Sequence, residues 1–209
     1  MALRLDPVER VFTLVVPRGM SERKALRFAE GQEGWMQEKL SALPPMIAFE
    51  DGAVINILGR RTEICVHQEP DMRVTKIALE GDVLHVRTNK DDPSLRIVRF
   101  LKGFAKEELS LLAAAKAARI GRDIHSISVR DTKSRWGSCS VDGDLSFSWR
   151  LIFAPYDAFD YVVAHEVAHL EHMNHSSAFW DLCADLCENY EEGRYWMKAH
   201  GSELMRYKS

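Results

Sequence analysis

Short apolar runs separated by turn signals fill the first half of the chain, a pattern typical of β-strands. We expect five strands, at residues 11–16, 53–58, 63–67, 75–79 and 83–88. One helix is expected between the first two strands, at residues 21–40, with Ser21 as its N-cap. The pattern therefore predicts a small β-rich N-terminal module over residues 1–92.

The pattern changes after Pro93. Residues 94–119 are rich in Leu, Ala and Lys, and this composition predicts one long helix. Two more strands are expected, at residues 124–129 and 145–153, and the second of them alternates apolar and polar positions. A polar loop with a turn at Asp142-Gly143 should connect these two strands.

Apolar positions recur at helical spacing from Asp157 onward, so a helix is expected there with Asp157 as its N-cap. Ser176 or Ser177 can cap a further helix. Residues 93–209 therefore mix helices with strands and form the second predicted domain. For the whole chain we expect an α+β fold.

Composition and charge exclude several classes of protein. The 209 residues are 46% hydrophobic and 28% charged, which is typical of a globular chain. The net charge of −3 gives no general attraction to nucleic acid or an anionic membrane, and nine acids but no Lys or Arg lie between Arg150 and Arg194. No apolar run reaches the roughly 18 residues of a membrane span, and the charged N-terminus lacks a secretory signal. We expect a cytoplasmic protein.

The strongest chemical signal is the segment His165-Glu166-Val167-Ala168-His169. Residues four apart share one face of an α-helix, so both imidazoles can bind one zinc ion at about 2.0 to 2.1 Å. Glu166 lies between them and can take a proton from a metal-bound water. Random placement of eight His and 17 Glu would give this pentapeptide in roughly 2% of such chains.

A catalytic zinc needs a third protein ligand, and His175 follows His165 at the ten-residue interval of one elongated zinc-protease motif. Asn174 can adopt the left-handed conformation that ends many helices, which would turn His175 back toward the metal. That motif has Gly where this chain has His172, and His172 is itself an alternative ligand. The other alternative is a carboxylate of the next helix, from Asp181, Asp185 or Glu188.

These residue types indicate amide hydrolysis, in which zinc polarises the carbonyl and Glu166 passes a proton to the leaving amine. An additional donor should stabilise the oxyanion. The candidates for that donor are Arg150, Tyr156, Tyr190, Tyr195 and His200. The strand at residues 145–153 is either a plain core strand or one whose exposed edge pairs with an extended peptide.

Several segments resemble the YgjP-like metallopeptidase family, a zincin-like group related at the fold level to SprT-like proteases. They are Arg135-Trp136-Gly137-Ser138-Cys139, Trp149-Arg150-Leu151-Ile152, Ala154-Pro155, Asp160-Tyr161-Val162-Val163, His165-Glu166-Val167-Ala168-His169-Leu170, Asn174-His175-Ser176 and Phe179-Trp180. The match is dense from about residue 130 to 200. It departs from the family at Ser148, where Asn is usual, and at Val167, which replaces a common Leu.

The resemblance implies a zincin-like metallopeptidase domain over residues 93–209, with the HExxH helix beside a mixed β-sheet. It also implies a zinc-dependent peptidase that acts on peptide or protein substrates. In that reading His165, His169 and His175 are the metal ligands, and Glu166 is the catalytic base that activates the metal-bound water. The family name supplies no particular substrate.

Two other functions compete with this one. SprT-like relatives act on DNA-bound proteins, and a modest basic stretch would suit a nucleic-acid-associated protein, although the net negative charge argues against it. That stretch comprises Lys116, Arg119, Arg122, Arg130, Lys133 and Arg135. The other alternative is a noncatalytic scaffold with structural zinc, which would have no use for Glu166 beside an open coordination position.

Overall fold

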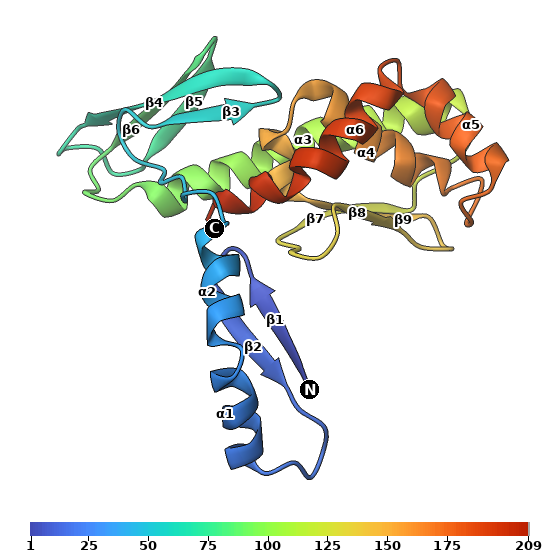
Figure 1. Cartoon of the computed structure of the whole chain (residues 1–209). Coiled ribbons are helices and arrows are strands. Elements are labelled where there is room, and N and C mark those ends of the chain that lie inside the picture. Colours follow the sequence, from blue (N-terminus) through green and yellow to red (C-terminus); the bar gives the residue numbers. More distant parts are fainter. Residues whose placement is uncertain (209) are drawn as a thin grey trace.

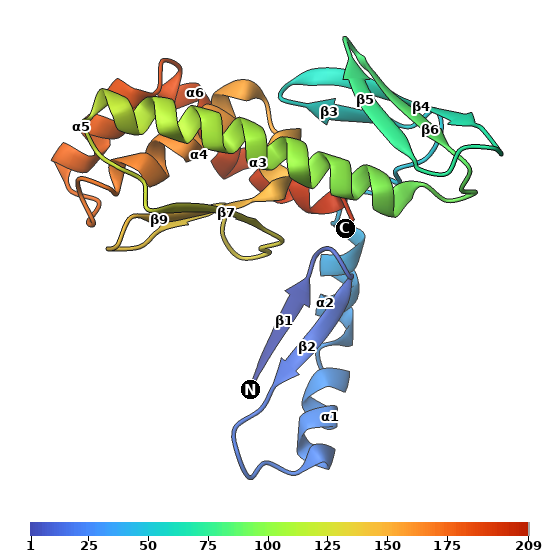
Figure 2. The ribbon, with the colours of Figure 1, turned by 180° about the vertical axis from the view of Figure 1, so that it is seen from behind.

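The longest helix, α3 (Ser94–Arg119), connects a four-stranded sheet at one end with a group of C-terminal elements at the other (Figures 1 and 2). The structure is a computed structural model that describes residues 1–208. The bounds of α3 are those predicted from composition. Its fully buried positions recur every four residues, which places them on one face. They are Ile97, Leu101, Ala105, Leu109 and Ala113.

The four-stranded sheet precedes α3 in the chain. Its strands are β3 (Val54–Ile57), β4 (Arg60–Gln68), β5 (Lys76–Glu80) and β6 (Val83–Thr88), in the order β3-β4-β6-β5. The β4–β6 pair is parallel and the other pairs are antiparallel, so the sheet is mixed. Each of the four was predicted within a few residues, because alternate positions such as Ile64 and Leu84 are buried.

Residues 1–43 form a stalk that projects from the rest of the molecule (Figure 1). It contains the hairpin β1 (Ala2–Asp6) and β2 (Val11–Val15), then α1 (Glu22–Glu30) and α2 (Glu33–Ser41). Of its 43 residues only Val8 and Ala25 are buried. The prediction of a single helix at residues 21–40 is wrong, because this segment forms two helices, α1 and α2, with a break near Gly31. Ser21 does precede α1, but its side chain forms no capping hydrogen bond.

The C-terminal elements place helices over a second, three-stranded sheet (Figure 1). Its strands are β7 (Ser126–Arg130), β8 (Gly137–Cys139) and β9 (Asp144–Ser148), in the order β7-β9-β8. The 3-10 helix η1 (Trp149–Phe153) follows, then α4 (Tyr156–Ala168), α5 (Ser177–Leu186), α6 (Tyr190–His200) and the 3-10 helix η2 (Gly201–Arg206). Helices and mixed sheets are thus both present, as the expected α+β class requires. The division into domains at residues 92 and 93 stays a prediction.

The strand expected at residues 145–153 is only half right. β9 ends at Ser148, and the next five residues form η1, in which every side chain is buried. Where both faces are buried, an alternating pattern no longer distinguishes a strand from a tight helix. β9 is also the central strand of its sheet, in agreement with the plain core strand that was one of the two alternatives, and the edge strands are β7 and β8. Similarly, α4 begins at Tyr156 after Pro155, so Asp157 is not its N-cap.

No helix within residues 1–208 combines the length and the apolar character that crossing a membrane would require.

A buried ion pair and a hydrogen bond from the same ammonium group join α3, α4 and α5. The ammonium of Lys116 on α3 lies 2.6 Å from Asp160 Oδ1 on α4 and donates a hydrogen bond to the carbonyl oxygen of Leu186 at the end of α5. Lys116 is 5% exposed and Asp160 8%. Charges taken out of water are tolerated only when they are paired and hydrogen-bonded, so this contact fixes α4 against α3 and α5.

We predict that Asp160→Asn lowers the free energy of unfolding by about 3 kcal/mol or more, because it leaves a buried ammonium without its counter-charge. The matched control is Glu171→Gln, which breaks an exposed ion pair with Arg122 and should change the stability far less, because water screens that pair. Urea denaturation of both variants measures the difference. Equal, small losses would show that the buried pair does not stabilise the helix packing.

Candidate functional site

The HExxH segment lies at the C-terminal end of α4. His165 and Glu166 belong to its last turn, and His169 directly follows its last residue in a right-handed conformation. The chain then turns because the backbone N–H of His172 donates to the carbonyl oxygen of Ala168, at 3.0 Å. This turn returns the chain to His175, just before α5.

Asn174 does not adopt the left-handed conformation predicted for it. Among the described residues other than glycine, a positive φ occurs at Arg10 and Leu58 and not at Asn174. Its side-chain oxygen instead accepts a hydrogen bond from the backbone N–H of Ser176, at 3.3 Å. Ser176 is the N-cap of α5, as predicted, and its hydroxyl accepts from the backbone N–H of Phe179. The loop is therefore stabilised by local side-chain bonds at the start of α5.

Three imidazoles converge at this point. The candidate ligand atoms of His165, His169 and His175 all lie within 4.8 Å of one another, and the Nε2 atoms of His165 and His175 are 3.2 Å apart. Two nitrogens bound to one tetrahedral zinc ion at its usual bond length would be separated by about 3.3 Å. The donor set and its spacing therefore fit a single metal ion.

The alternative ligands weighed from the sequence do not join this group. His165, His169 and His175 form the one group of at least three His, Cys, Asp or Glu side chains within residues 1–208 that could hold a metal ion. The carboxylates of Asp181, Asp185 and Glu188 lie outside it.

His172 contributes through its backbone rather than its side chain. Its carbonyl oxygen lies 2.9 Å from Nδ1 of His169, which suits an Nδ1–H donor and leaves Nε2 of that ring free to bind a metal. Hydrogen bonds of this kind fix the tautomer and the orientation of ligand histidines.

Burial keeps the imidazoles of His165 and His169 neutral. Desolvation, with a smaller effect from His169 and His175, lowers the pKa of His165 to about 4. Desolvation also lowers the pKa of His169, partly opposed by its bond to the carbonyl of His172. A histidine must be neutral to bind a metal, so both groups are in the ligand state at neutral pH.

Two aromatic side chains of α5 hold the histidine rings in place. The ring centroid of Phe179 lies 5.0, 4.5 and 4.7 Å from those of His165, His169 and His175. Trp180 stacks on His175 with centroids 5.3 Å apart. Nothing in the sequence signalled this direct contact between Trp180 and His175.

Glu166 lies in the wall between α4 and β8 and is 5% exposed. Burial raises the pKa of its carboxyl group to about 7, against the opposing charge of Arg135. Gly137 of β8 faces it so closely that a Cβ there would lie 2.5 Å from Glu166 Cγ and nearer still to Oε1. Any larger residue at position 137 would displace this carboxylate from its observed position, a requirement that the sequence alone did not reveal.

A cavity of about 350 Å³ opens beside His165 and Glu166. Besides these two, its walls include Trp136 and Gly137 at β8, Tyr161 and Val162 on α4, and Arg194, Met197 and Lys198 on α6. Sequence reasoning missed Tyr161, Arg194 and Lys198. A signal was available, because Tyr161 precedes His165 by one helical turn and Arg194 ends the long interval without basic residues.

None of the five residues proposed as oxyanion donors is among those that line this cavity. Arg150 is buried and donates to the carbonyl oxygen of Tyr207, and Tyr156 lies at the opposite end of α4. His200 pairs with Glu203, and Tyr195 is 70% exposed. Tyr190 reaches the site only indirectly, through its ring contact with Tyr161.

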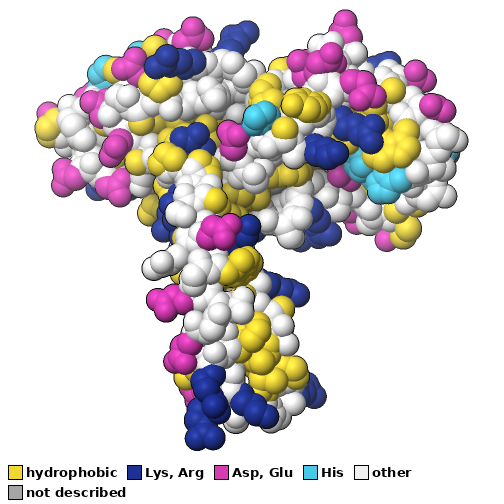
Figure 3. Space-filling view, viewed as in Figure 1, with side chains coloured by type: hydrophobic (Ala, Val, Ile, Leu, Met, Phe, Trp, Pro, Cys, Tyr) yellow, Lys and Arg dark blue, Asp and Glu magenta, His cyan; other side chains and the backbone are white. Residues whose placement is uncertain are grey.

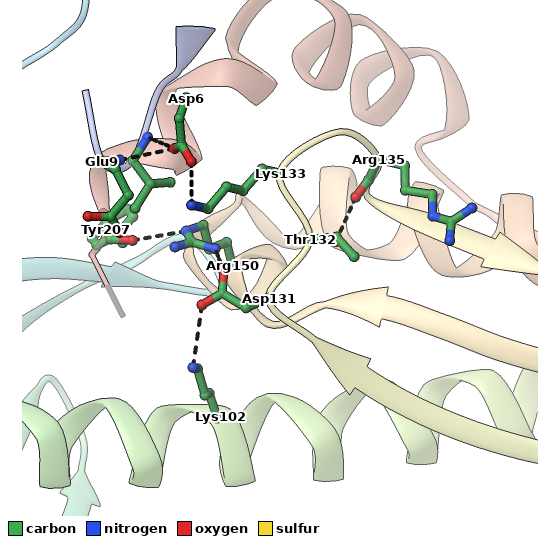
Figure 4. Close-up of polar contacts among 10 residues, drawn as sticks. Asp6, Glu9, Lys102, Asp131, Thr132, Lys133, Arg135, Arg150 and Tyr207 are labelled. Atoms are coloured by element: carbon green, nitrogen blue, oxygen red, sulfur yellow. Dashed lines mark hydrogen bonds and ion pairs between the residues drawn. The ribbon is translucent and has the colours of Figure 1, made fainter. Parts of the chain in front are cut away.

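The loop that leads into β8 is anchored by a polar network (Figure 4). Asp131 binds both Arg150 and Lys102, and Thr132 donates to the carbonyl oxygen of Arg135, at 2.8 Å. Lys133 forms an ion pair with Asp6 of the stalk, at 2.6 Å. This network fixes the position from which the next two residues, Trp136 and Gly137, reach the cavity.

Comparison with known proteins gives one family. The model of the YgjP-like metallopeptidase domain matches residues 1–200. No curated protein matches the chain. Among solved structures, it is similar to the metallopeptidase zymogen abylysin of Pyrococcus abyssi, with 21% sequence identity and a TM-score of 0.38. That alignment covers 44% of this chain and 94% of the other.

The raised pKa of Glu166 predicts how stability depends on pH in protein freed of metal by EDTA. Between about pH 4.5 and 7 this group ionises in the unfolded chain but stays protonated in the folded one, so it destabilises the wild type as pH rises. Glu166→Gln lacks this effect and should gain roughly 3 kcal/mol relative to wild type across that range. Urea denaturation at several pH values tests this, and a constant difference would contradict it.

Proposed function

The chain belongs to the YgjP-like metallopeptidase family, and from this premise we propose that it is a zinc-dependent peptidase. In this proposal His165, His169 and His175 hold the metal, and Glu166 is the general base. The observation that carries it is the convergence of three imidazoles within 4.8 Å of one another, next to a buried carboxylate with a raised pKa. A family of metallopeptidases implies a metal ion, and the choice of zinc rests on the donor set.

Three imidazoles are a donor set typical of catalytic zinc, which keeps a fourth position for water or substrate. When bound, zinc would polarise the carbonyl of the scissile bond and lower the pKa of a water molecule. The hydrogen bond from His169 to the carbonyl oxygen of His172 and the contacts with Phe179 orient the rings for this purpose.

Glu166 performs the proton transfers. Its carboxylate accepts a proton from the attacking water and delivers it to the nitrogen of the leaving amine. A pKa of about 7 suits both steps, because a group that titrates near the working pH can accept and release a proton. β8 lies at the edge of its sheet beside Glu166, and we propose that an extended peptide binds along it by backbone hydrogen bonds.

The nucleic-acid alternative is weakened by the contacts of the basic stretch. Lys116 is buried against Asp160, Arg119 donates to backbone carbonyl oxygens at the end of α5, and Arg122 and Lys133 pair with acids. Four of the six cations expected to contact phosphate are therefore engaged within the chain. No observation favours nucleic acid as a ligand over a peptide.

We predict that His175→Ala loses most of its zinc, whereas His172→Ala retains it, because His172 acts through a carbonyl oxygen that alanine also provides. Metal content is measured by mass spectrometry after dialysis against limiting zinc. Full zinc occupancy in His175→Ala would remove His175 from the ligand set. Loss of zinc in His172→Ala would point to an imidazole ligand that the proposal omits.

Two further variants separate catalysis from metal binding. We predict that Glu166→Gln keeps its zinc but loses about 100-fold or more in kcat, because the proton acceptor is gone. Gly137→Ala should also keep zinc and lose about 100-fold, since the new methyl group displaces the Glu166 carboxylate.

The matched control is Gly103→Ala on α3, where a Cβ meets no atom within 4 Å. Hydrolysis of a quenched fluorescent peptide library measures all three variants. Retained activity in Glu166→Gln would exclude the proposed base, and zinc bound by a wild type that hydrolyses no peptide would favour the structural-zinc alternative.

A further inference from the structure

Helix α6 contributes two cations to the cavity beside Glu166. Arg194 and Lys198 are four residues apart, so they lie on the same face of the helix, and both line the cavity. In the space-filling view basic side chains lie over α6, close to a group of histidines (Figure 3). Neither Arg194 nor Lys198 had a role predicted from the sequence.

The packing of α6 against α4 fixes the position of Arg194. At the preceding residue, Gly193, a Cβ would lie 2.7 Å from Tyr161 Cβ and nearer still to the carbonyl oxygen of Asp157. The two helices therefore cross in close contact at Gly193, and the next side chain is directed by that crossing. α6 cannot move away from the cavity without losing this contact.

Aromatic rings hold the guanidinium group of Arg194 beside the histidines. Its Cζ atom lies 4.9 Å from the ring centroid of Trp180 and 5.8 Å from that of Tyr190. Trp180 in turn stacks on His175. One N–H of this guanidinium is shared with the Tyr190 hydroxyl, and the others remain available to a carboxylate.

These two cations have no carboxylate partner. Within residues 1–208 neither Arg194 nor Lys198 forms an ion pair, although Glu191 and Glu192 lie on the same helix. Glu166 is the one acid that lines the cavity, and it is buried. Arg194 also lines a neighbouring hollow together with Asp181, Glu188, Glu191 and Glu192, so acids lie on that side of it. On the side of Glu166, Arg194 and Lys198 favour an anionic ligand, and Arg135 adds positive charge near Glu166.

We propose that Arg194 and Lys198 form a subsite for a carboxylate of the substrate, next to the scissile bond. This inference rests on the proposed peptidase function and names its substrate class: peptides with an acidic side chain, or a free C-terminus, at that position. Both sources present the same carboxylate, which Arg194 can bind through two parallel N–H donors. Lys198 adds a second positive charge one helical turn away.

The first test is digestion of a proteome-derived peptide library by the zinc-loaded wild type, with cleavage sites identified by mass spectrometry. A side-chain subsite gives enrichment of Asp and Glu at one fixed position from the cleaved bond. A C-terminal subsite gives cleavage near free C-termini that disappears when the library is amidated. Cleavage without either preference overturns the proposal.

Variants assign the preference to the two cations. We expect Arg194→Glu and Lys198→Glu each to lower kcat/KM for the preferred acidic peptides about fivefold, and to favour peptides with Lys or Arg at that position. Arg194→Lys keeps the charge and should retain part of the preference. The control is Lys24→Glu on α1 of the stalk, which makes the same charge change far from the cavity and should leave the preference unchanged. A preference that survives both glutamate variants overturns the proposal.

Binding without turnover separates this proposal from the peptidase function. The probes are acetyl-Ala-Ala-Glu-Ala-Ala-amide, its Gln counterpart, and the Gln peptide with a free C-terminus, titrated into zinc-loaded Glu166→Gln and followed by NMR. We expect one carboxylate peptide to bind about fivefold more tightly than the neutral one, and this difference to vanish when Arg194→Glu is added. Equal binding of all three overturns the subsite. If the wild type cleaves no peptide but Glu166→Gln still binds a carboxylate peptide more tightly than the neutral one, the subsite is upheld and the peptidase proposal is overturned.

Discussion

The enclosure of α4 is the constraint on which the rest of the structure depends. α3 and α5 contact this helix through the buried Lys116–Asp160 pair, and α6 crosses it at Gly193. β8 closes the remaining side at Gly137. A helix enclosed in this way, apart from the cavity beside Glu166, keeps water from most of its side chains. The same packing that fixes the histidines therefore also sets the protonation of the groups around them.

Two carboxylates on α4 show how local surroundings decide what an acid does. Asp160 faces an ammonium at 2.6 Å and serves the packing of three helices. Glu166, almost two turns further along, faces a glycine and forms no ion pair, so burial raises the pKa of its carboxyl group toward neutrality against the weaker effect of Arg135. Both residues carry the same carboxyl group, but that of Asp160 stabilises the fold whereas that of Glu166 is available for proton transfer.

The sequence predicted elements whose pattern is local, and it failed where tertiary contacts decide. The bounds of α3 followed from composition, and Ser176, the N-cap of α5, was one of the two serines predicted for that position. η1 was mistaken for strand, because five consecutive buried residues carry no period. The convergence of His165, His169 and His175 followed from spacing, although the turn between them uses backbone hydrogen bonds rather than the left-handed Asn174 that we expected. Gly137 and Arg194 act through contacts with residues distant in sequence, which no local pattern encodes.

The stalk differs from the rest of the chain in how little it buries. Two interior side chains, Val8 and Ala25, cannot match the burial that stabilises the helices around α4, so local opening of residues 1–43 must require less free energy than global unfolding. Its backbone amides should exchange with solvent long before those of α3. The link between Asp6 and Lys133 spans the two regions, so each opening event releases one restraint on the segment before Trp136 while His165 and His169 keep their packing. The two ends of this molecule can thus fluctuate on separate timescales within one continuous chain.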